Sequence, residues 1–267
     1  MRVLLTNDDG IDAPGLGALY AQLASLGEVA VVAPAKVQSA MSHSVTFHRP
    51  VEVTRREVSL NGLGTEAVTG FEGWAVDGRP ADCVKLAMTH VLEEWGRPDL
   101  VVSGMNAGAN VGLNVLYSGT VAAAVEAAFI GVPAIAVSLH LGEKQGVRWK
   151  RAAELARRAI DLALDGPMHG HTAVNINVPI LDRRDDPEGI AVVPVETSPT
   201  LTGYAVEHHE DGRSSYAVNS ALAFADVRPD TDVHALFAGY TTVTPLQFDL
   251  TGHGKLDAWR AHLALHG

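Results

Sequence analysis

The chain opens with Arg2-Val3-Leu4-Leu5-Thr6-Asn7-Asp8-Asp9-Gly10, a short apolar run that ends in two adjacent aspartates. The apolar residues predict a buried strand over 2–6, and Gly10 permits a turn directly after it. Side chains of an extended strand alternate between two faces, so both carboxylates can share an ion only if the backbone turns there. Asn, Asp and Gly are also common turn formers. The stretch therefore predicts either an ordinary strand-to-helix turn or the anionic part of a divalent-cation site.

Composition and charge restrict the class of protein. The chain has 267 residues, of which 47% are hydrophobic, which is enough for one large α/β core with an extension. A formal net charge of −11 argues against binding a nucleic-acid polymer or an anionic membrane, because both need clustered Lys and Arg. Cys83 is the only cysteine, so neither an intramolecular disulfide nor a thiolate zinc site is expected. Without a leader-like segment or a span-length apolar run, we expect a cytoplasmic protein.

Strand and helix patterns alternate along the first two thirds of the chain. Leucines at helical spacing from Leu16 to Leu26 follow the first strand, and Val29 to Ala33 gives the next strand, which makes a β-α-β unit. Residues 45–76 suggest hairpins at a sheet edge. The later pattern predicts a helix from Pro80 to Trp95, strands over 100–102, 134–138 and 173–178, and helices over 121–130 and 152–162. We therefore expect an α/β fold.

The alternation lapses beyond about residue 185. Short β segments follow, separated by Gly, Pro and acidic turns, with a hairpin predicted around Glu210-Asp211-Gly212. We accordingly divide the chain into a catalytic core over 1–184 and a β-rich oligomerisation extension over 185–267. Because the extension has few means of burying its apolar strands alone, we expect it to pack on a partner subunit.

Small and polar residues follow three predicted strands where each ends. The aspartate pair follows the first, the loop from Gln38 to Ser44 follows the second, and the run from Ser103 to Asn110 follows the strand over 100–102. The carboxyl ends of parallel strands gather at one edge, where ligands bind. Ser39 and Asn106 can each offer a neutral oxygen to an ion held by the aspartates, and such hard donors suit Mg²⁺ or Mn²⁺. Local capping is the competing role for both residues.

A second group of residues suggests phosphate binding. Ser118-Gly119-Thr120 opens an apolar helix, whose first N–H groups and dipole attract phosphate. An ordinary N-cap is the alternative. The run from Gly104 to Gly112, with Asn110, also consists of small residues, but it lacks the lysine of a P-loop and the spacing of a dinucleotide fingerprint. His43 lies in the Ser39 loop and is either a substrate contact or a surface histidine.

Five ordered motifs carry a family resemblance. They are M-R-V-L-L-T-N-D-D-G-I-D-A-P-G at 1–15, A-P-A-K-V-Q-S-A at 33–40, S-G-M-N-A-G-A-N-V-G at 103–112, Y-S-G-T-V-A-A-A-V-E at 117–126 and T-P-L-Q-F-D-L-T at 244–251. Together they resemble the SurE family of metal-dependent 5′/3′-nucleotidases, which are also described as survival proteins. The resemblance extends along essentially the whole chain.

The resemblance implies a Rossmann-like, three-layer αβα core with a mainly parallel sheet. It implies one divalent metal ion per subunit, held by residues Asp8, Asp9, Ser39 and Asn106. It further implies phosphate release from nucleoside monophosphates, with exopolyphosphate cleavage as a side activity, and a C-terminal extension exchanged within a homodimer that can pair into a homotetramer. Arg79 stands where the family usually has Thr, which leaves substrate preference open.

The expected chemistry is attack of a metal-activated water on a phosphomonoester. Asp8 and Asp9 would be the catalytic anchors of the ion, and one of them can double as the base. The substrate or its phosphate would contact residues Ser39, His43, Gly104, Asn106, Asn110, Ser118, Gly119 and Thr120. Two alternatives remain: a phosphatase with an aspartyl-phosphate intermediate, whose aspartates would lie two apart rather than adjacent, and a non-enzymatic nucleotide-binding module.

Overall fold

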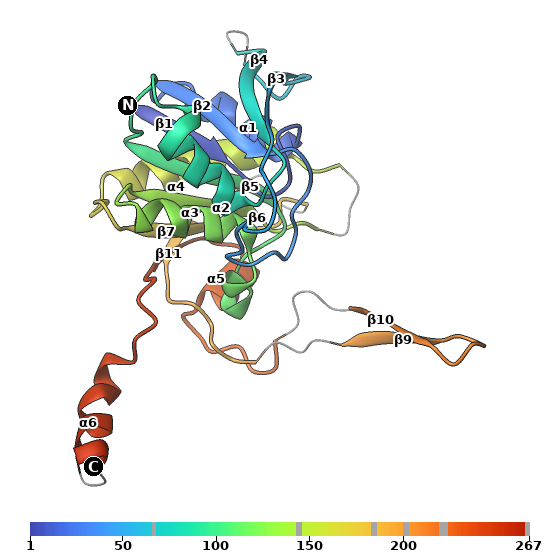
Figure 1. Cartoon of the computed structure of the whole chain (residues 1–267), viewed down its shortest axis with the longest axis vertical. Helices are drawn as coiled ribbons and strands as arrows, with labels where there is room; N and C mark the ends of the chain where they lie inside the picture. Colours follow the sequence, from blue (N-terminus) through green and yellow to red (C-terminus); the bar gives the residue numbers. More distant parts are fainter. Residues whose placement is uncertain (66–67, 143–145, 183–185, 200–202, 219–223, 265–267) are drawn as a thin grey trace.

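A computed structural model describes residues 1–65, 68–142, 146–182, 186–199, 203–218 and 224–264 (Figure 1). Its described residues form one large sheet in the order β3-β4-β2-β1-β5-β6-β7-β11-β8. The bounds of these strands are β1 (Arg2–Thr6), β2 (Glu28–Pro34), β3 (Val53–Ser59), β4 (Gly70–Val76), β5 (Leu100–Ala107), β6 (Ala134–Leu139), β7 (Ala173–Val178), β8 (Ile190–Val192) and β11 (Thr241–Leu246). The pairs β3–β4 and β11–β7 are antiparallel, and the other pairs are parallel. The predicted mainly parallel α/β fold is confirmed.

Helices cover both faces of the sheet (Figure 1). Helices α1 (Pro14–Leu23) and α4 (Trp149–Leu164) pack on one face, and α2 (Pro80–Leu86) and α3 (Gly119–Phe129) on the other. Side chains of β1 alternate between the two cores, with Leu5 in one and Leu4 in the other. This alternation is the period of two that a strand buried on both faces requires. The three-layer αβα core follows from it.

Several element boundaries differ from the sequence prediction. The helix expected from Pro80 to Trp95 stops being α-helical at Leu86 and continues as a π-helical turn, η1 (Ala87–Val91). The strand expected over 100–102 extends to Ala107, so Asn106 lies inside β5 instead of in a loop. The hairpin expected within 45–76 is present as β3 and β4, paired from Val53–Val76 to Ser59–Gly70.

The segment after residue 185 is divided between the core and two protruding elements. Strands β8 and β11 join the large sheet, whereas the hairpin of β9 (Tyr204–His208) and β10 (Ser214–Val218) and helix α6 (Leu256–Ala264) project from it (Figure 1). The hairpin predicted around Glu210 is confirmed. Helices α5 (Asp232–Phe237) and α6 were not predicted in an extension expected to be β-rich, and two short 3₁₀ turns are η2 (Gly112–Leu116) and η3 (His253–Lys255). The predicted boundary at 184/185 lies outside the described residues.

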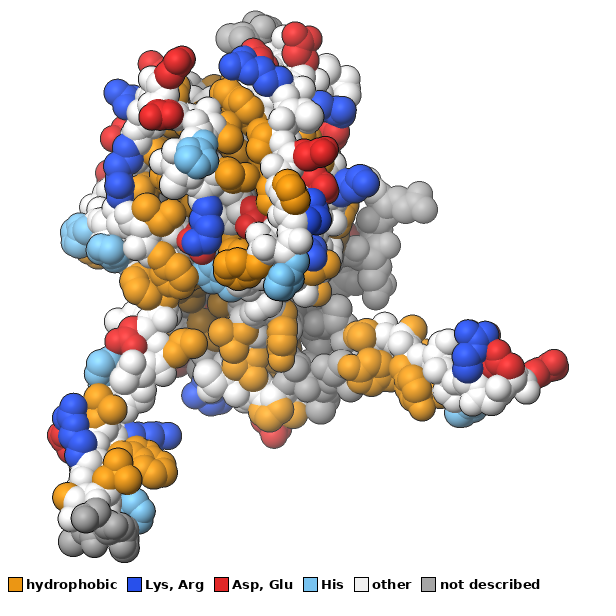
Figure 2. All heavy atoms as spheres, in the orientation of Figure 1, with side chains coloured by type: hydrophobic (Ala, Val, Ile, Leu, Met, Phe, Trp, Pro, Cys, Tyr) orange, Lys and Arg blue, Asp and Glu red, His pale blue; other side chains and the backbone are white. Residues whose placement is uncertain are grey.

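The protruding elements expose apolar side chains. Figure 2 shows such side chains on both the hairpin and α6. The exposed residues are Tyr204, Val206, Tyr216, Val218, Trp259 and Leu263. None of the described helices is both long and apolar enough to span a membrane.

A buried acidic cluster fastens α5 to the core. Asp232 Oδ2 accepts a hydrogen bond from the backbone N of Gly112 at 2.9 Å, and Asp232 Oδ1 accepts one from the backbone N of Glu196 at 2.8 Å. Glu196 in turn accepts hydrogen bonds from the backbone N of Arg228 at 2.7 Å and Ser198 at 2.8 Å. Burial alone would raise the pKa of Glu196, but these hydrogen bonds outweigh it and lower the pKa to about 2. Ionised Glu196 therefore stabilises the fold.

We expect Glu196→Gln to lower the free energy of unfolding at pH 7 by about 1–3 kcal/mol, because the change weakens hydrogen bonds to a buried charge. The folded pKa lies below the ordinary value of 4.5, so this stabilisation is present above pH 4.5 and is lost as the pH falls toward 2. Thermal melts of both proteins across this range should therefore converge at low pH. Glu57→Gln, at an exposed position on β3, is the control. A difference in melting temperature that stays constant with pH would contradict the assignment.

Candidate functional site

An open pocket of about 300 Å³ lies at the carboxyl edge of the sheet. The ends of β1 and β5, the loop after β2 and the start of α3 all contribute to it. Its lining comprises Asp8, Asp9, Ser39, Ala40, Asn106, Ala107, Gly108, Ala109, Asn110, Asn114, Tyr117 and Ser118. The structure thus brings together all four residues expected to hold a metal ion and two further residues expected to contact substrate or phosphate, Asn110 and Ser118.

The turn after β1 is closed by Asn7. Its Nδ2 donates to the carbonyl oxygen of Gly10 at 2.8 Å, and its Oδ1 accepts from the backbone N of Gly10 at 3.2 Å. Gly10 has a φ of +99°, a conformation that glycine adopts without strain. Because Asn7 supplies the turn's hydrogen bonds, both aspartate side chains are available to line the pocket. The turn and the acidic site therefore coexist, one residue apart.

Asp8 is almost completely buried where β1 meets α3. Its Oδ1 accepts a hydrogen bond from Thr120 Oγ1 at 2.6 Å. Burial raises the pKa of Asp8 to about 6; the Thr120 bond lowers it, and the Asp9 charge adds to the rise. A Cβ on Gly119 would lie 2.9 Å from the Asp8 Cβ, so only glycine allows this approach of helix to strand. Thr120 and Gly119 thus position Asp8. Neither residue is part of the described pocket lining.

Asp9 is held by the neighbouring strand. Its Oδ2 accepts a hydrogen bond from the backbone N of Ala107, at the end of β5, at 2.8 Å. Burial raises the pKa of Asp9, and this hydrogen bond only partly offsets the rise. One carboxylate oxygen of each aspartate therefore accepts a hydrogen bond from the protein, and the other oxygen can serve a ligand in the pocket. Two partly desolvated like charges in contact are unfavourable until a cation enters.

The neutral oxygens come from two different elements. Asn106 lies in β5, and its Nδ2 donates to the carbonyl oxygen of Gly108 at 2.7 Å, which keeps the amide Oδ1 as an acceptor. Ser39 follows Gln38, whose backbone N donates to the carbonyl oxygen of Asp8 at 2.7 Å. The Gln38 side chain accepts from Arg79 Nη1 at 2.5 Å. Arg79 therefore acts on the Ser39 loop, and its effect on substrate preference stays a prediction.

These residues form a hard, all-oxygen donor set. Two carboxylates, one amide and one hydroxyl suit Mg²⁺ or Mn²⁺ and lack the imidazole or thiolate ligands that zinc prefers. Within the described residues no cluster of three or more His, Cys, Asp or Glu side chains has metal-binding geometry. Burial, with a smaller contribution from the Asp9 charge, raises the pKa of Asp8, and a bound cation would offset both effects. The residues present therefore fit a hard divalent ion.

Asn110 is the anchor of the pocket floor. Its backbone N donates to Asn177 Oδ1, and its Nδ2 donates to Ser138 Oγ, both at 2.8 Å. Its carbonyl oxygen accepts from Asn175 Nδ2 at 2.8 Å. Strands β6 and β7 therefore fix the position of a residue that sequence reasoning offered only as a substrate contact.

Besides Gly119 and Thr120, two more predicted contacts lie outside the described pocket lining, His43 and Gly104. His43 Nε2 is 2.8 Å from Glu126 Oε2, and its ring stacks on Phe129 with centroids 5.0 Å apart. Glu126 also accepts from Lys85 Nζ at 2.5 Å. Gly104 is buried in β5, where a Cβ would lie 2.3 Å from the carbonyl oxygen of Val137. Gly104 serves the close approach of β5 to β6, and His43 holds the Ser39 loop against α3.

Sequence reasoning missed two side chains at the pocket rim, Asn114 and Tyr117. Both belong to the segment between β5 and α3, of which the sequence analysis assigned candidate contacts only up to Asn110 and from Ser118. The signal for Tyr117 was its place next to Ser118, because the residue before a helix N-cap lies beside the helix start.

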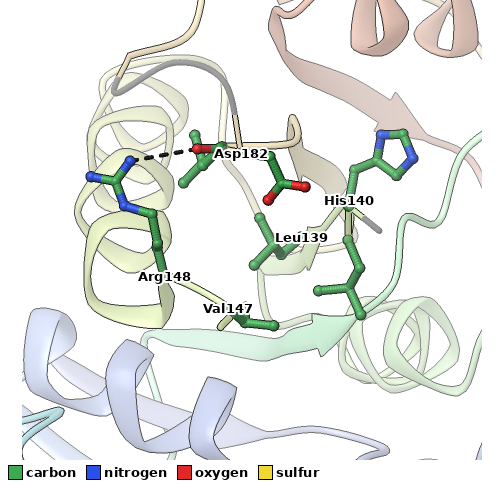
Figure 3. A pocket seen from close by; sticks show the side chains of 8 residues that line it. Leu139, His140, Val147, Arg148 and Asp182 are labelled. Carbon is green, nitrogen blue, oxygen red and sulfur yellow. Dashed lines mark hydrogen bonds between the residues drawn. The ribbon is translucent and has the colours of Figure 1, made fainter. Parts of the chain in front are cut away.

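A second pocket at the same edge is far smaller. Figure 3 shows it between the ends of β6 and β7, with Arg148 Nη1 donating to the carbonyl oxygen of Leu181 at 3.5 Å. Its lining comprises Leu139, His140, Leu141, Gly142, Val147, Arg148, Leu181 and Asp182. The volume of about 20 Å³ accommodates one water molecule and no nucleotide. Burial lowers the pKa of His140, which packs against Phe237. The pocket lined by Asp8 and Asp9 is therefore the candidate site at this edge.

A parallel αβα sheet with an acidic pocket at its carboxyl edge defines a ligand-binding α/β protein. The family described as survival protein SurE matches residues 3–200. The chain is 40% identical over 264 residues to the 5′-nucleotidase SurE of Moorella thermoacetica, covering 99% of this chain and 96% of that one. It is 41% identical over 259 residues to the Nitrosococcus oceani protein of the same name, covering 96% and 95%. The chain belongs to the SurE family.

A solved structure agrees with this assignment. The crystal structure of the SurE protein from Aquifex aeolicus superposes with a TM-score of 0.78 at 32% identity, and the match covers 97% of this chain and 98% of that one. The similarity therefore includes the protruding segments after residue 185 as well as the core.

We expect Gly119→Ala to displace Asp8 and to weaken divalent-metal binding at least tenfold, because the added Cβ would lie 3.0 Å from Asp8 Oδ2 as well as against its Cβ. Calorimetric titration with Mn²⁺ measures the effect. Alanine is the better helix former, so the helix itself should lose little stability. The control is Gly254→Ala, where an added Cβ meets nothing within 4 Å. Unchanged Mn²⁺ affinity in Gly119→Ala would show that the approach of α3 to Asp8 does not set the site.

Proposed function

We propose that this protein is a divalent-metal-dependent phosphomonoesterase that releases phosphate from nucleoside 5′- and 3′-monophosphates. The observation that carries the proposal is the convergence of Asp8 and Asp9 with the start of α3 in one open pocket. The family membership supports it, since similar proteins of the family are named 5′-nucleotidases. The cytoplasmic location stays a prediction from the sequence.

The metal-binding residues would be Asp8, Asp9, Ser39 and Asn106, with one Mg²⁺ or Mn²⁺ per subunit. A bound ion of this kind polarises phosphoryl oxygens and lowers the pKa of a coordinated water. Thr120 fixes the orientation of Asp8, and the backbone of Ala107 fixes that of Asp9, so the anionic oxygens are preorganised. Either aspartate can accept the proton of the attacking water.

The start of α3 would hold the phosphate. Ser118 caps the helix by accepting a hydrogen bond from the backbone N of Val121 at 3.1 Å. The first N–H groups of a helix have no partner within it, and the helix dipole adds positive potential there. Gly119 keeps this terminus close to Asp8, so a phosphate bound beside Asp8 would also reach the helix start. The same arrangement can take the terminal phosphate of polyphosphate, which we propose as a side activity.

Two other functions use the same pocket differently. Attack by an aspartate on phosphorus would give an aspartyl-phosphate, but one oxygen of both Asp8 and Asp9 already accepts a protein hydrogen bond. A non-enzymatic nucleotide-binding module would bind without release. Phosphate release from adenosine 5′-monophosphate with Mn²⁺, lost on chelation, separates the enzyme from the binding module. Absence of release under these conditions would overturn the proposal.

We expect Asp9→Asn to reduce phosphate release by two orders of magnitude or more, on the order of the contribution of a metal-activated water. In the presence of a chelator the variant should be as stable as the wild type or slightly more so, because the change removes one of two repelling carboxylates. Metal should raise the melting temperature of the wild type by mass action.

Asp12→Asn is the matched control, since Asp12 is exposed and pairs with Arg56 outside the pocket. Full activity of Asp9→Asn in excess chelator would show that the ion is not catalytic. A large loss of stability without metal would show that Asp9 serves the turn instead of the site.

We also propose that the protein is a homodimer, which can pair into a homotetramer, through the segment after residue 185. All ten residues of β9 and β10 are exposed, and their strands pair only with each other among the described residues. An isolated two-stranded hairpin is marginally stable in water. Burial of Tyr204, Tyr216 and Val218 against another subunit would supply the missing stabilisation.

Replacing residues 204–218 with a short Gly-Ser linker should therefore yield a monomer in analytical ultracentrifugation, because it removes the exposed apolar strands and leaves the large sheet intact. The control is a full-length protein carrying Glu207→Gln, which changes charge but keeps the hairpin. A full-length protein that sediments as a monomer at micromolar concentration would contradict the proposed assembly.

A further inference from the structure

The pocket has an apolar side that neither the metal nor the phosphate explains. Tyr117 lines the pocket, and the residue is 60% exposed. Leu116 beside it is 61% exposed, and Met41, from the Ser39 loop, is 37% exposed. Tyr117 is the one of these three that lines the pocket, and a large exposed aromatic side chain in the lining of a polar pocket is typical of a ligand-binding surface.

The backbone that carries these side chains is held firmly. The backbone N of Ser42 donates to the carbonyl oxygen of Tyr117 at 2.9 Å, and Ser42 Oγ donates to the carbonyl oxygen of Leu116 at 2.7 Å. Ser42 and Ala40 have φ values of +52° and +55°, which are costly for residues other than glycine and persist only where contacts enforce them. The rim is therefore built rigidly although its side chains are exposed.

The chain itself limits the distance between Tyr117 and the proposed phosphate site. Tyr117 directly precedes Ser118, the N-cap of α3, and adjacent Cα atoms lie about 3.8 Å apart. A phosphate held between Asp8 and the start of α3 is therefore within one nucleoside length of the tyrosine. An aromatic ring at that separation suits a planar base attached through a sugar, because bases stack on tyrosine faces.

We propose that Tyr117 determines specificity by stacking on the base of a nucleoside monophosphate. The inference rests on the proposed function and adds the residue by which the site would prefer phosphomonoesters with a base over those without one. Stacking tolerates any base, because every base has a π-face, so Tyr117 selects nucleotides as a class and does not discriminate among them. Its contribution is to substrate affinity, since the ring lies beyond the reacting phosphorus.

The test compares Tyr117→Ala, Tyr117→Phe and wild type with Mn²⁺ on two substrates, adenosine 5′-monophosphate and ribose 5-phosphate, which lacks the base. Tyr117→Ala should raise KM for adenosine 5′-monophosphate on the order of tenfold, the size of one base-stacking contact, with kcat nearly unchanged. It should leave kcat/KM for ribose 5-phosphate nearly unchanged. Tyr117→Phe keeps an aromatic face and should retain wild-type KM values.

Phe47→Ala is the matched control, because Phe47 is 82% exposed and lies outside the described pocket lining. Equal losses on both substrates, or no loss on adenosine 5′-monophosphate, would overturn the role of Tyr117. A shift of Tyr117→Ala to a smaller assembly in ultracentrifugation would assign the ring to a subunit interface and overturn it as well. A wild type that releases phosphate from neither substrate would instead overturn the proposed function itself.

Discussion

The hydrogen bond from Thr120 Oγ1 to Asp8 Oδ1 joins the two halves of the site. It connects the end of β1 to the first turn of α3, two elements more than a hundred residues apart in the chain. Gly119 makes the contact possible, because a side chain there would occupy the space of Asp8. Through this contact, the acidic end of a strand and the positive end of a helix dipole face one pocket. The fit of a cation and a phosphate together depends on it.

The same contact has an energetic consequence. Burial raises the pKa of both Asp8 and Asp9, so their ionised forms oppose the folded state when no cation is present. The protein offsets part of this cost with one hydrogen bond to each carboxylate and leaves the rest uncompensated. An uncompensated buried charge of this kind is expected where function, and not stability, determines which residues are present. An ion that enters the pocket is therefore linked to stability as well as to chemistry.

Away from the acidic pair, hydrogen bonds fix the loops around the pocket to the neighbouring elements. Ser42 fastens the loop after β2 to the segment before α3, and Asn110 fastens the pocket floor to β6 and β7. The Glu196 and Asp232 carboxylates do the same for α5, reaching Gly112 near the pocket. The rim is thereby rigid enough to present exposed side chains such as Tyr117 in defined positions. In contrast, β9 and β10 have no such ties to the large sheet among the described residues.

The sequence alone was sufficient for the parallel α/β core, because alternating burial and helical spacing are local patterns visible in β1 and α1. It also placed Asp8, Asp9, Ser39 and Asn106 at one edge, since parallel strands end on the same side of a sheet. Only the tertiary structure decided that Gly119 and Thr120 position Asp8, that His43 pairs with Glu126, and that β8 and β11 complete the sheet. These outcomes depend on contacts between residues far apart in the chain. Local sequence patterns do not show which distant residues will meet, so these contacts are determined by tertiary packing.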